Sequence, residues 1–195
     1  MKIKKDFFKK QYSNCFKYLG ESWKPILYIF VIFVVFGLIG FFVPAPSTIS
    51  SAILSYINQL LEKTQDYGFS KMLFYIFFNN LKTSFFGLFI GILFGVFSIF
   101  TALGNGYVLG FVASKSVMAK GSIVLFRIFP HGIFELPAVF ISLGLGLRLG
   151  SFFLSENKSK FIKENLGNSL RTFLLVVIPL LIIAAIIETI LIFFT

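Results

Sequence analysis

The sequence predicts an all-α fold, a polytopic transmembrane helical bundle of about five spans. Hydrophobic residues make up 57% of the 195 residues and charged residues 13%, whereas soluble domains are about 45–50% apolar and about 25% charged. Several apolar runs are long enough to cross roughly 30 Å of hydrocarbon. The Lys and Arg residues flank those runs, as the positive-inside rule describes. We therefore expect one integral membrane domain over residues 1–195.

The net charge of +10 does not indicate nucleic-acid binding, because the cations are not gathered in a folded basic domain. Cys15 is the single cysteine, which excludes an intrachain disulfide. The first apolar run is too long for the core of a signal peptide, and no small-residue cleavage site follows it. We expect that run to remain as a spanning helix.

The first third of the chain contains one predicted span between two amphipathic segments. Residues 1–22 are rich in lysine, and we expect them on the cytoplasmic side, as an interfacial helix or a solvated segment. The first span covers residues 23–43 and ends at the PAPS sequence, since proline cannot continue a helix. Residues 47–66 place apolar side chains on one face and are too polar to span, which predicts an external amphipathic helix.

The middle of the chain is predicted to contain two further spans. Residues 69–80 form an apolar segment that leads toward the membrane. We expect the sequence NNLK to break it, and a second span to follow at 81–101. A third span is expected at 102–120, loosened by Gly104, Asn105 and Gly106. In an alternative topology, residues 102–129 dip into the membrane and return.

Glycines at a spacing of four predict close helix contacts, since small residues let helices approach in lipid. They also allow a homo-oligomer. The expected contact glycines are Gly87, Gly91, Gly95, Gly106, Gly110, Gly146 and Gly150.

The last third of the chain is predicted to end on the external side. Residues 122–150 form a fourth span of two half-helices, or a re-entrant hairpin, broken at Pro130-His131-Gly132. Residues 151–171 are polar and basic, so we expect a cytoplasmic loop. The fifth span is expected at 172–194.

The strongest candidate site lies at the predicted break. His131, the only histidine, and Glu135 are four residues apart, so they share a helix face. Pro130 suits the first turn of a half-helix, and irregular backbone at membrane depth must face protein or a watery cavity. The two groups could relay protons or contact ions. Alternatively, they bond each other, Arg127 or free backbone groups and fix the break.

Other polar residues are secondary candidates. Glu188 is expected to pair with Lys82, Lys115 or Lys120, or to lie at the membrane interface. Asn80 and Asn105 are expected to cap helices or bond between them. No metal site or cofactor is predicted, because one histidine without a thiolate cluster cannot provide a zinc site. No set of catalytic side chains can be assembled from the sequence.

Two segments, PHGIFELPAVFISLGLGLRLG at 130–150 and NNLKTSFFGLFIGILFGVFSIFTALGNGYVLG at 79–110, closely resemble the stage II sporulation protein M family. The resemblance implies a five-span membrane protein that is not itself a hydrolase. It also implies a role beside peptidoglycan-degrading partners in envelope remodelling, and it makes Pro130, His131, Gly132, Glu135 and Pro137 the family signature.

We therefore expect a non-enzymatic integral membrane protein that organises or anchors a complex, with the bilayer and membrane or envelope proteins as its partners. The alternative is a small transporter, channel or permease subunit that uses an intramembrane site at His131 and Glu135.

Overall fold

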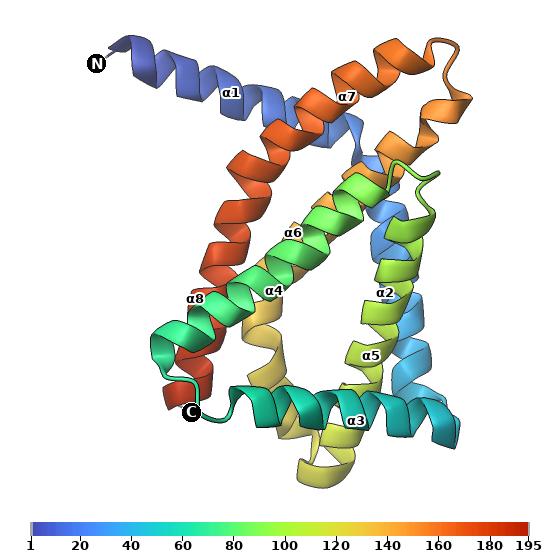
Figure 1. Ribbon diagram of the computed structural model, residues 1–195, viewed down its shortest axis with the longest axis vertical. Helices are drawn as coiled ribbons and strands as arrows, with labels where there is room; N and C mark the ends of the chain where they lie inside the picture. Colours follow the sequence, from blue (N-terminus) through green and yellow to red (C-terminus); the bar gives the residue numbers. More distant parts are fainter. Residues whose placement is uncertain (1, 195) are drawn as a thin grey trace.

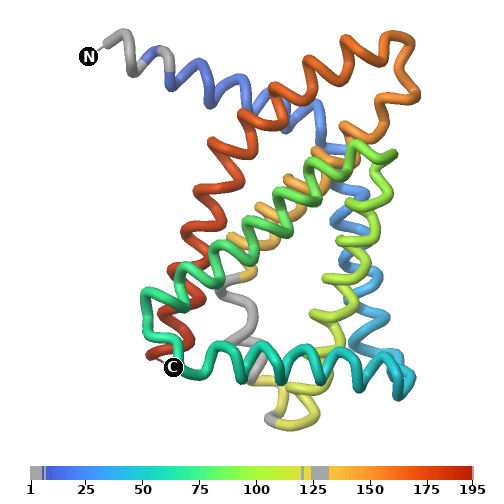
Figure 2. Tube along the Cα trace, viewed as in Figure 1, coloured from blue at the N-terminus to red at the C-terminus, as the bar shows by residue number. Residues whose placement is uncertain are grey.

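The computed structural model describes the backbone of residues 2–194 and the side chains of this range apart from 2–5, 7, 120 and 124–131 (Figure 2). The described chain is built from helices and has no strand within residues 2–194, which confirms the predicted all-α class. Five segments of the described residues are long and apolar enough to cross a membrane. The predicted five-span bundle is therefore confirmed.

The spanning helices run alternately down and up in Figure 1. They are α2 (Trp23–Phe42), α4 (Phe69–Ile90), α5 (Val96–Lys120), α6 (Leu125–Gly150) and α8 (Ile178–Phe194). A π-helical turn, Phe173–Val177, leads into α8. Pro179 has no N–H to offer to the carbonyl four residues earlier, which is consistent with the widened helix there.

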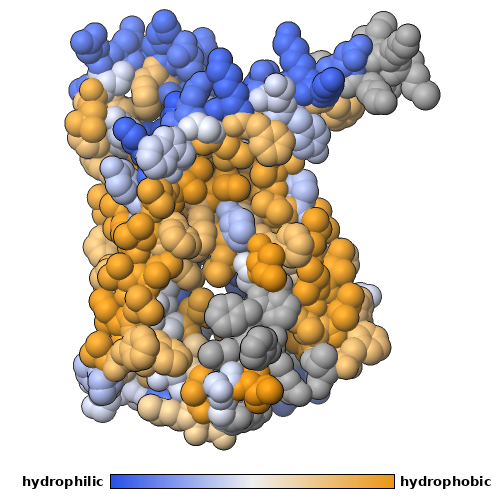
Figure 3. Space-filling view, turned by 180° about the vertical axis from the view of Figure 1, so that it is seen from behind, coloured by the Kyte–Doolittle hydropathy of each residue, from blue (hydrophilic) through white to orange (hydrophobic). Residues whose placement is uncertain are grey.

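Three polar or amphipathic helices cover the two ends of the bundle. The helices α1 (Lys2–Glu21) and α7 (Lys158–Thr172) lie at one end, and α3 (Ser47–Thr64) lies across the other (Figure 1). Hydrophilic residues gather at the end with α1 and α7, above a hydrophobic band (Figure 3). The described parts of the two termini lie at opposite ends, as an odd number of spans requires.

The predicted boundaries of the second and third spans are wrong. The sequence NNLK does not break the helix, because α4 continues from Phe69 to Ile90. The chain reverses at 91–95, where Phe94 and Gly95 have φ of +56° and +70°. The apolar residues on both sides of this turn concealed it. The third span accordingly begins at Val96, and Gly104, Asn105 and Gly106 lie inside a regular helix.

The predicted break at Pro130 is also wrong. The helix α6 is continuous from Leu125 to Gly150, so it starts five residues before the proline. A proline this close to the start of a helix removes a single hydrogen bond of the i to i−4 ladder, and α6 continues past it. The fourth span is thus one helix rather than two half-helices or a re-entrant hairpin.

The helix α6 is the centre of the bundle. Half of its spanning window is buried, against 17% for α2. One core cluster joins it to α4 and α8 through Leu88, Leu145 and Leu181, and a second joins it to α2 and α5 through Ile29, Ala102 and Leu143. Residues 130–150, which carry part of the family resemblance, therefore lie on the spanning helix with the largest buried share.

Candidate functional site

The α2–α5 contact brings two helix backbones together at glycines. An added Cβ on Gly40 would overlap with the carbonyl oxygen of Tyr107, and one on Gly110 would overlap with that of Gly37. A Cβ on Gly106 would overlap with Phe33 in the same way. We call this contact the α2–α5 seam. Because lipid offers little hydrophobic drive for helix association, such close van der Waals contact must provide most of it.

A second seam joins α6 to the end of α4 and to the turn that follows. A Cβ on Gly91 would lie 2.6 Å from the Cα of Gly146, and one on Gly150 would lie 2.7 Å from the Cα of Gly95. A Cβ on Gly87 would overlap with the side chain of Leu143. All seven glycines expected at helix contacts thus lie against another element, although Gly91 and Gly95 do so from a turn.

Polar side chains secure this second seam from within. The Ser98 hydroxyl donates to the Gly87 carbonyl at 2.9 Å, and the Ser142 hydroxyl donates to the carbonyl of Ser84. Each bond joins a residue of one helix to the backbone of another. These hydroxyls satisfy their own hydrogen-bonding needs while adding a link between helices in a region without water.

Three of the sequence-derived candidates meet between α4, α6 and α8. The Asn80 side chain is a hydrogen-bond partner of the Glu135 carboxyl group, and Glu188 lies close enough to Glu135 for the two carboxyl groups to interact electrostatically. The sequence predicts that Glu188 pairs with a lysine or lies at the membrane interface, and it does not predict this acidic neighbour.

The remaining candidates are separated from that cluster or fall outside the described side chains. Asn105 is exposed on α5, and Pro137 is exposed on α6. Gly132 has room beside it, since an added Cβ would make ordinary contact with Leu136 at 3.5 Å. The side chains of Arg127, Pro130 and His131 lie outside the described part of the chain, so the predicted pairing of His131 remains a prediction.

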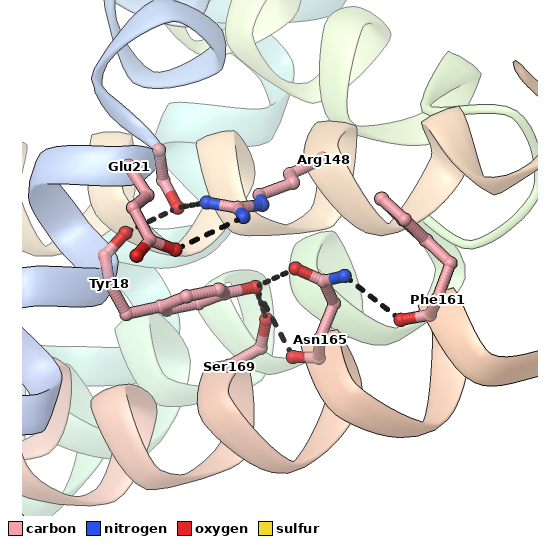
Figure 4. Close-up of polar contacts among 7 residues, drawn as sticks. Tyr18, Glu21, Arg148, Phe161, Asn165 and Ser169 are labelled. Atoms are coloured by element: carbon pink, nitrogen blue, oxygen red, sulfur yellow. Dashed lines mark hydrogen bonds and ion pairs between the residues drawn. The ribbon is translucent and has the colours of Figure 1, made fainter. Parts of the chain in front are cut away.

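A polar network at the α1 and α7 end was not predicted from the sequence. The Tyr18 hydroxyl donates to the Asn165 side-chain oxygen at 3.1 Å and lies 2.9 Å from the Ser169 hydroxyl (Figure 4). Tyr18 is 4% exposed. Burial raises the pKa of its phenol, which the Ser169 hydrogen bond and the charge of Arg148 partly offset. The phenol therefore stays a neutral donor that ties α1 to α7.

Arg148 connects this network to α6. Its guanidinium donates to the Ser22 hydroxyl at 2.6 Å, lies 3.5 Å from the Glu21 carboxylate and stacks 4.5 Å from the centre of the Tyr18 ring. Ser22 in turn donates to the Tyr18 carbonyl. One arginine thus fixes the bend between α1 and α2 against the end of the central helix, using the planar, multidentate geometry that lysine lacks.

Sequence reasoning missed this network because its members are far apart in the chain. Tyr18 and Asn165 are separated by 147 residues, and no spacing rule joins them. Arg148 carried a usable signal, since an arginine in a GLRLG run at the end of an apolar segment needs a partner. The described residues hold no group of three or more His, Cys, Asp or Glu side chains arranged to bind a metal ion.

Five apolar spans packed through glycine seams, with charged helices confined to the ends, define a polytopic α-helical integral membrane protein. The sequence model of the family described as stage II sporulation protein M matches residues 29–191. The chain therefore belongs to the stage II sporulation protein M family. No match is found among curated proteins or among solved structures.

Proposed function

We propose that this protein is a non-enzymatic scaffold or anchor of a membrane complex, and that the complex takes part in remodelling the cell envelope. The observation that carries the proposal is the exposure of the amphipathic helix α3. This 18-residue amphipathic helix has no buried residue, and Ile49, Leu54 and Leu61 of its apolar stripe are exposed. A stripe of this kind stabilises a helix only when something covers it.

The ends of the bundle support an external position for α3. Twelve of the 18 Lys and Arg residues lie in α1, at the start of α2, at the end of α6 or in α7. By the positive-inside rule, this end faces the cytoplasm. The opposite end, with α3, then faces the envelope, and the N-terminal and C-terminal ends lie inside and outside respectively.

A groove beside α3 offers a place for an external partner segment. It has a volume of about 550 Å³ and lies between α3, the start of α4 and the end of α8. Its lining combines apolar side chains such as Leu61 and Phe193 with polar ones such as Asn58. That mixture matches the composition of protein interfaces, which are about as apolar as the rest of a protein surface.

The family supports the envelope role. Its description names a sporulation stage, and the resemblance described above implies work beside peptidoglycan-degrading proteins. Two observations support an anchor of such proteins: close backbone contacts hold the bundle together, and no residue of α3 is buried.

The test is co-purification of the full-length protein from its native host after mild crosslinking. We expect envelope proteins to be retained by the parent and lost from a Leu54→Gln, Leu61→Gln variant. A Thr48→Gln, Ser55→Gln variant changes the polar face of the same helix and should retain them. Retention by both variants, or no envelope protein with the parent, would refute the scaffold role.

The transporter alternative makes a different prediction. Its supporting observation is the Glu135, Asn80 and Glu188 cluster, yet neither carboxyl group lines the groove beside α3. Flux through liposomes with the parent, Glu135→Gln and His131→Ala separates the two functions. A flux that both substitutions abolish supports transport, whereas the absence of flux with all three proteins supports the scaffold.

A further inference from the structure

We infer that the elbow between α1 and α2 is a binding site for an anionic phospholipid of the leaflet that α1 faces. In this site one acyl chain lies between α2 and α6, and the headgroup lies beside Lys24 and Lys17. The inference does not depend on the scaffold role.

The acyl-chain part of the site is a groove of about 530 Å³. Leu19 and Trp23 line its upper end, and Phe30 and Ile141 line it further down α2 and α6. Pro137, a signature residue, lies on its wall. The volume falls within the range of about 300–1,000 Å³ for small-ligand sites, and the apolar lining within the hydrophobic band suits a hydrocarbon chain.

The arrangement of side chains around α1 places the groove at the level of lipid headgroups. Tyr12, Phe16 and Leu19 fall within about 60° of one another at 100° per residue. Cys15 and Tyr18 are buried on one side of this stripe, and Lys10 and Lys17 lie about 140–160° from Tyr12 on the other. Since Leu19 also lines the groove, the apolar stripe of α1 faces the hydrocarbon side. This order of faces is typical of a helix lying in the membrane interface.

The charge at the mouth of the groove selects the class of lipid. The Lys24 ammonium lies 5.9 Å from the centre of the Trp23 ring, and Lys17 is exposed on the polar face of α1, two residues before Leu19, which lines the groove. Glu21, the nearest acidic residue in the chain, is already paired with Arg148. The mouth is therefore cationic, and a phospholipid whose headgroup has a net negative charge complements it better than a zwitterionic phospholipid does.

Trp23 is the only tryptophan of the chain and lines the groove, so its fluorescence reports directly on what occupies the site. The full-length protein is reconstituted in phosphatidylcholine bilayers that contain a small fraction of lipid brominated on the acyl chains. The brominated lipid is either phosphatidylglycerol or phosphatidylcholine. Emission is normalised to the same mixture without bromine.

We expect brominated phosphatidylglycerol to quench Trp23 at several-fold lower mole fraction than brominated phosphatidylcholine. The difference should shrink in each of the single variants Lys17→Gln and Lys24→Gln, and it should disappear when both lysines are replaced. The matched pair Lys63→Gln and Lys71→Gln, at the opposite end of the bundle, should leave it unchanged.

A Leu27→Phe variant tests the groove itself, because Leu27 lines it and a larger side chain fills it. Quenching by both brominated lipids should fall, while Leu38→Phe, on the exposed lower part of α2, should have no effect. Equal quenching by the two lipids in the parent would overturn the inference. So would protection of Trp23 from both lipids, which would mean that a second copy or a partner helix covers the groove.

Discussion

The α2–α5 seam and α3 are two ways for a helix to meet the rest of the bundle. At the seam, Gly40 and Gly110 bring two backbones into direct contact, and no side chain can be added without moving a helix. In α3, no residue is buried, and Ile49, Leu54 and Leu61 of its apolar stripe are exposed. The comparison indicates that the seam determines the shape of the bundle, whereas α3 is left free for contacts beyond it.

The largest effect is expected at the seam. Gly110→Ala would push the α2 backbone away from α5, because the new Cβ meets the carbonyl of Gly37 rather than a flexible side chain. Overpacking of this kind costs about 1–3 kcal/mol, and rigid neighbours favour the upper end. Thermal unfolding in detergent should show a clear fall in the midpoint.

The matched control is Gly104→Ala on the same helix. Nothing lies within 4 Å of a Cβ at that position, so the midpoint should stay constant or rise through the higher helix propensity of alanine. Equal losses at Gly104 and Gly110 would show that α5 responds to any glycine replacement and that the seam has no special role.

The polar network at the end with α1 and α7 should show the next largest effect. Tyr18→Phe leaves Asn165 and Ser169 without their shared phenol partner, and an unsatisfied buried polar group costs about 1–3 kcal/mol. We expect a destabilisation of roughly 1–2 kcal/mol by thermal unfolding. Tyr12→Phe, at an exposed position of the same helix, should change stability little, and a loss as large as that of Tyr18→Phe would contradict the network's role.

The stabilisation provided by Tyr18 should also depend on pH in one direction. Its folded pKa is raised above the ordinary value of 10.0, chiefly by burial, so the unfolded chain loses this proton first as pH rises. The contribution is therefore complete below about pH 10 and declines above it. The thermal midpoints of the parent and Tyr18→Phe should converge as the pH rises above about 10, and a gap that widens there would reverse the sign.

The smallest effect is expected in α3. Leu54→Gln with Leu61→Gln should change the free energy of unfolding of the purified protein by no more than about 0.5 kcal/mol, because neither side chain is buried. Together with lost co-purification, this result would separate binding from stability. A loss as large as that of Gly110→Ala would mean that α3 belongs to the core of the bundle.

The spans themselves could be predicted from the sequence, because the composition of a lipid-facing helix is restricted. Residues 23–43 contain a single charge, Lys24, and PAPS ends the run, so α2 was placed within one residue of its observed end. The α4–α5 turn could not be predicted, since the residues around Gly91 and Gly95 are as apolar as a spanning helix. Hydropathy reports how apolar a segment is, and it does not detect a reversal of the backbone at the membrane edge.

The candidate site was predicted less completely. The importance of Glu135 followed from the cost of a carboxyl group in hydrocarbon, but its neighbour Glu188 comes from a helix that begins more than forty residues later. Likewise, the partners of Gly106 and Gly110 are Phe33 and Gly37, and neither of these was singled out in the sequence. Spacing within a helix can be read from one segment, whereas contacts between helices depend on how the segments pack.

The central claim is that α3 and the α1–α7 end lie on opposite sides of the membrane, with α3 outside. Cysteine labelling tests it most directly, because Cys15 is the only cysteine and is buried. In a Cys15→Ser background, Ser55→Cys reports on α3 and Ser159→Cys on α7, both at exposed positions. A membrane-impermeant maleimide added to intact cells should label the α3 cysteine and reach the α7 cysteine only after lysis. Labelling of α7 in intact cells, or of both positions equally, would contradict the account.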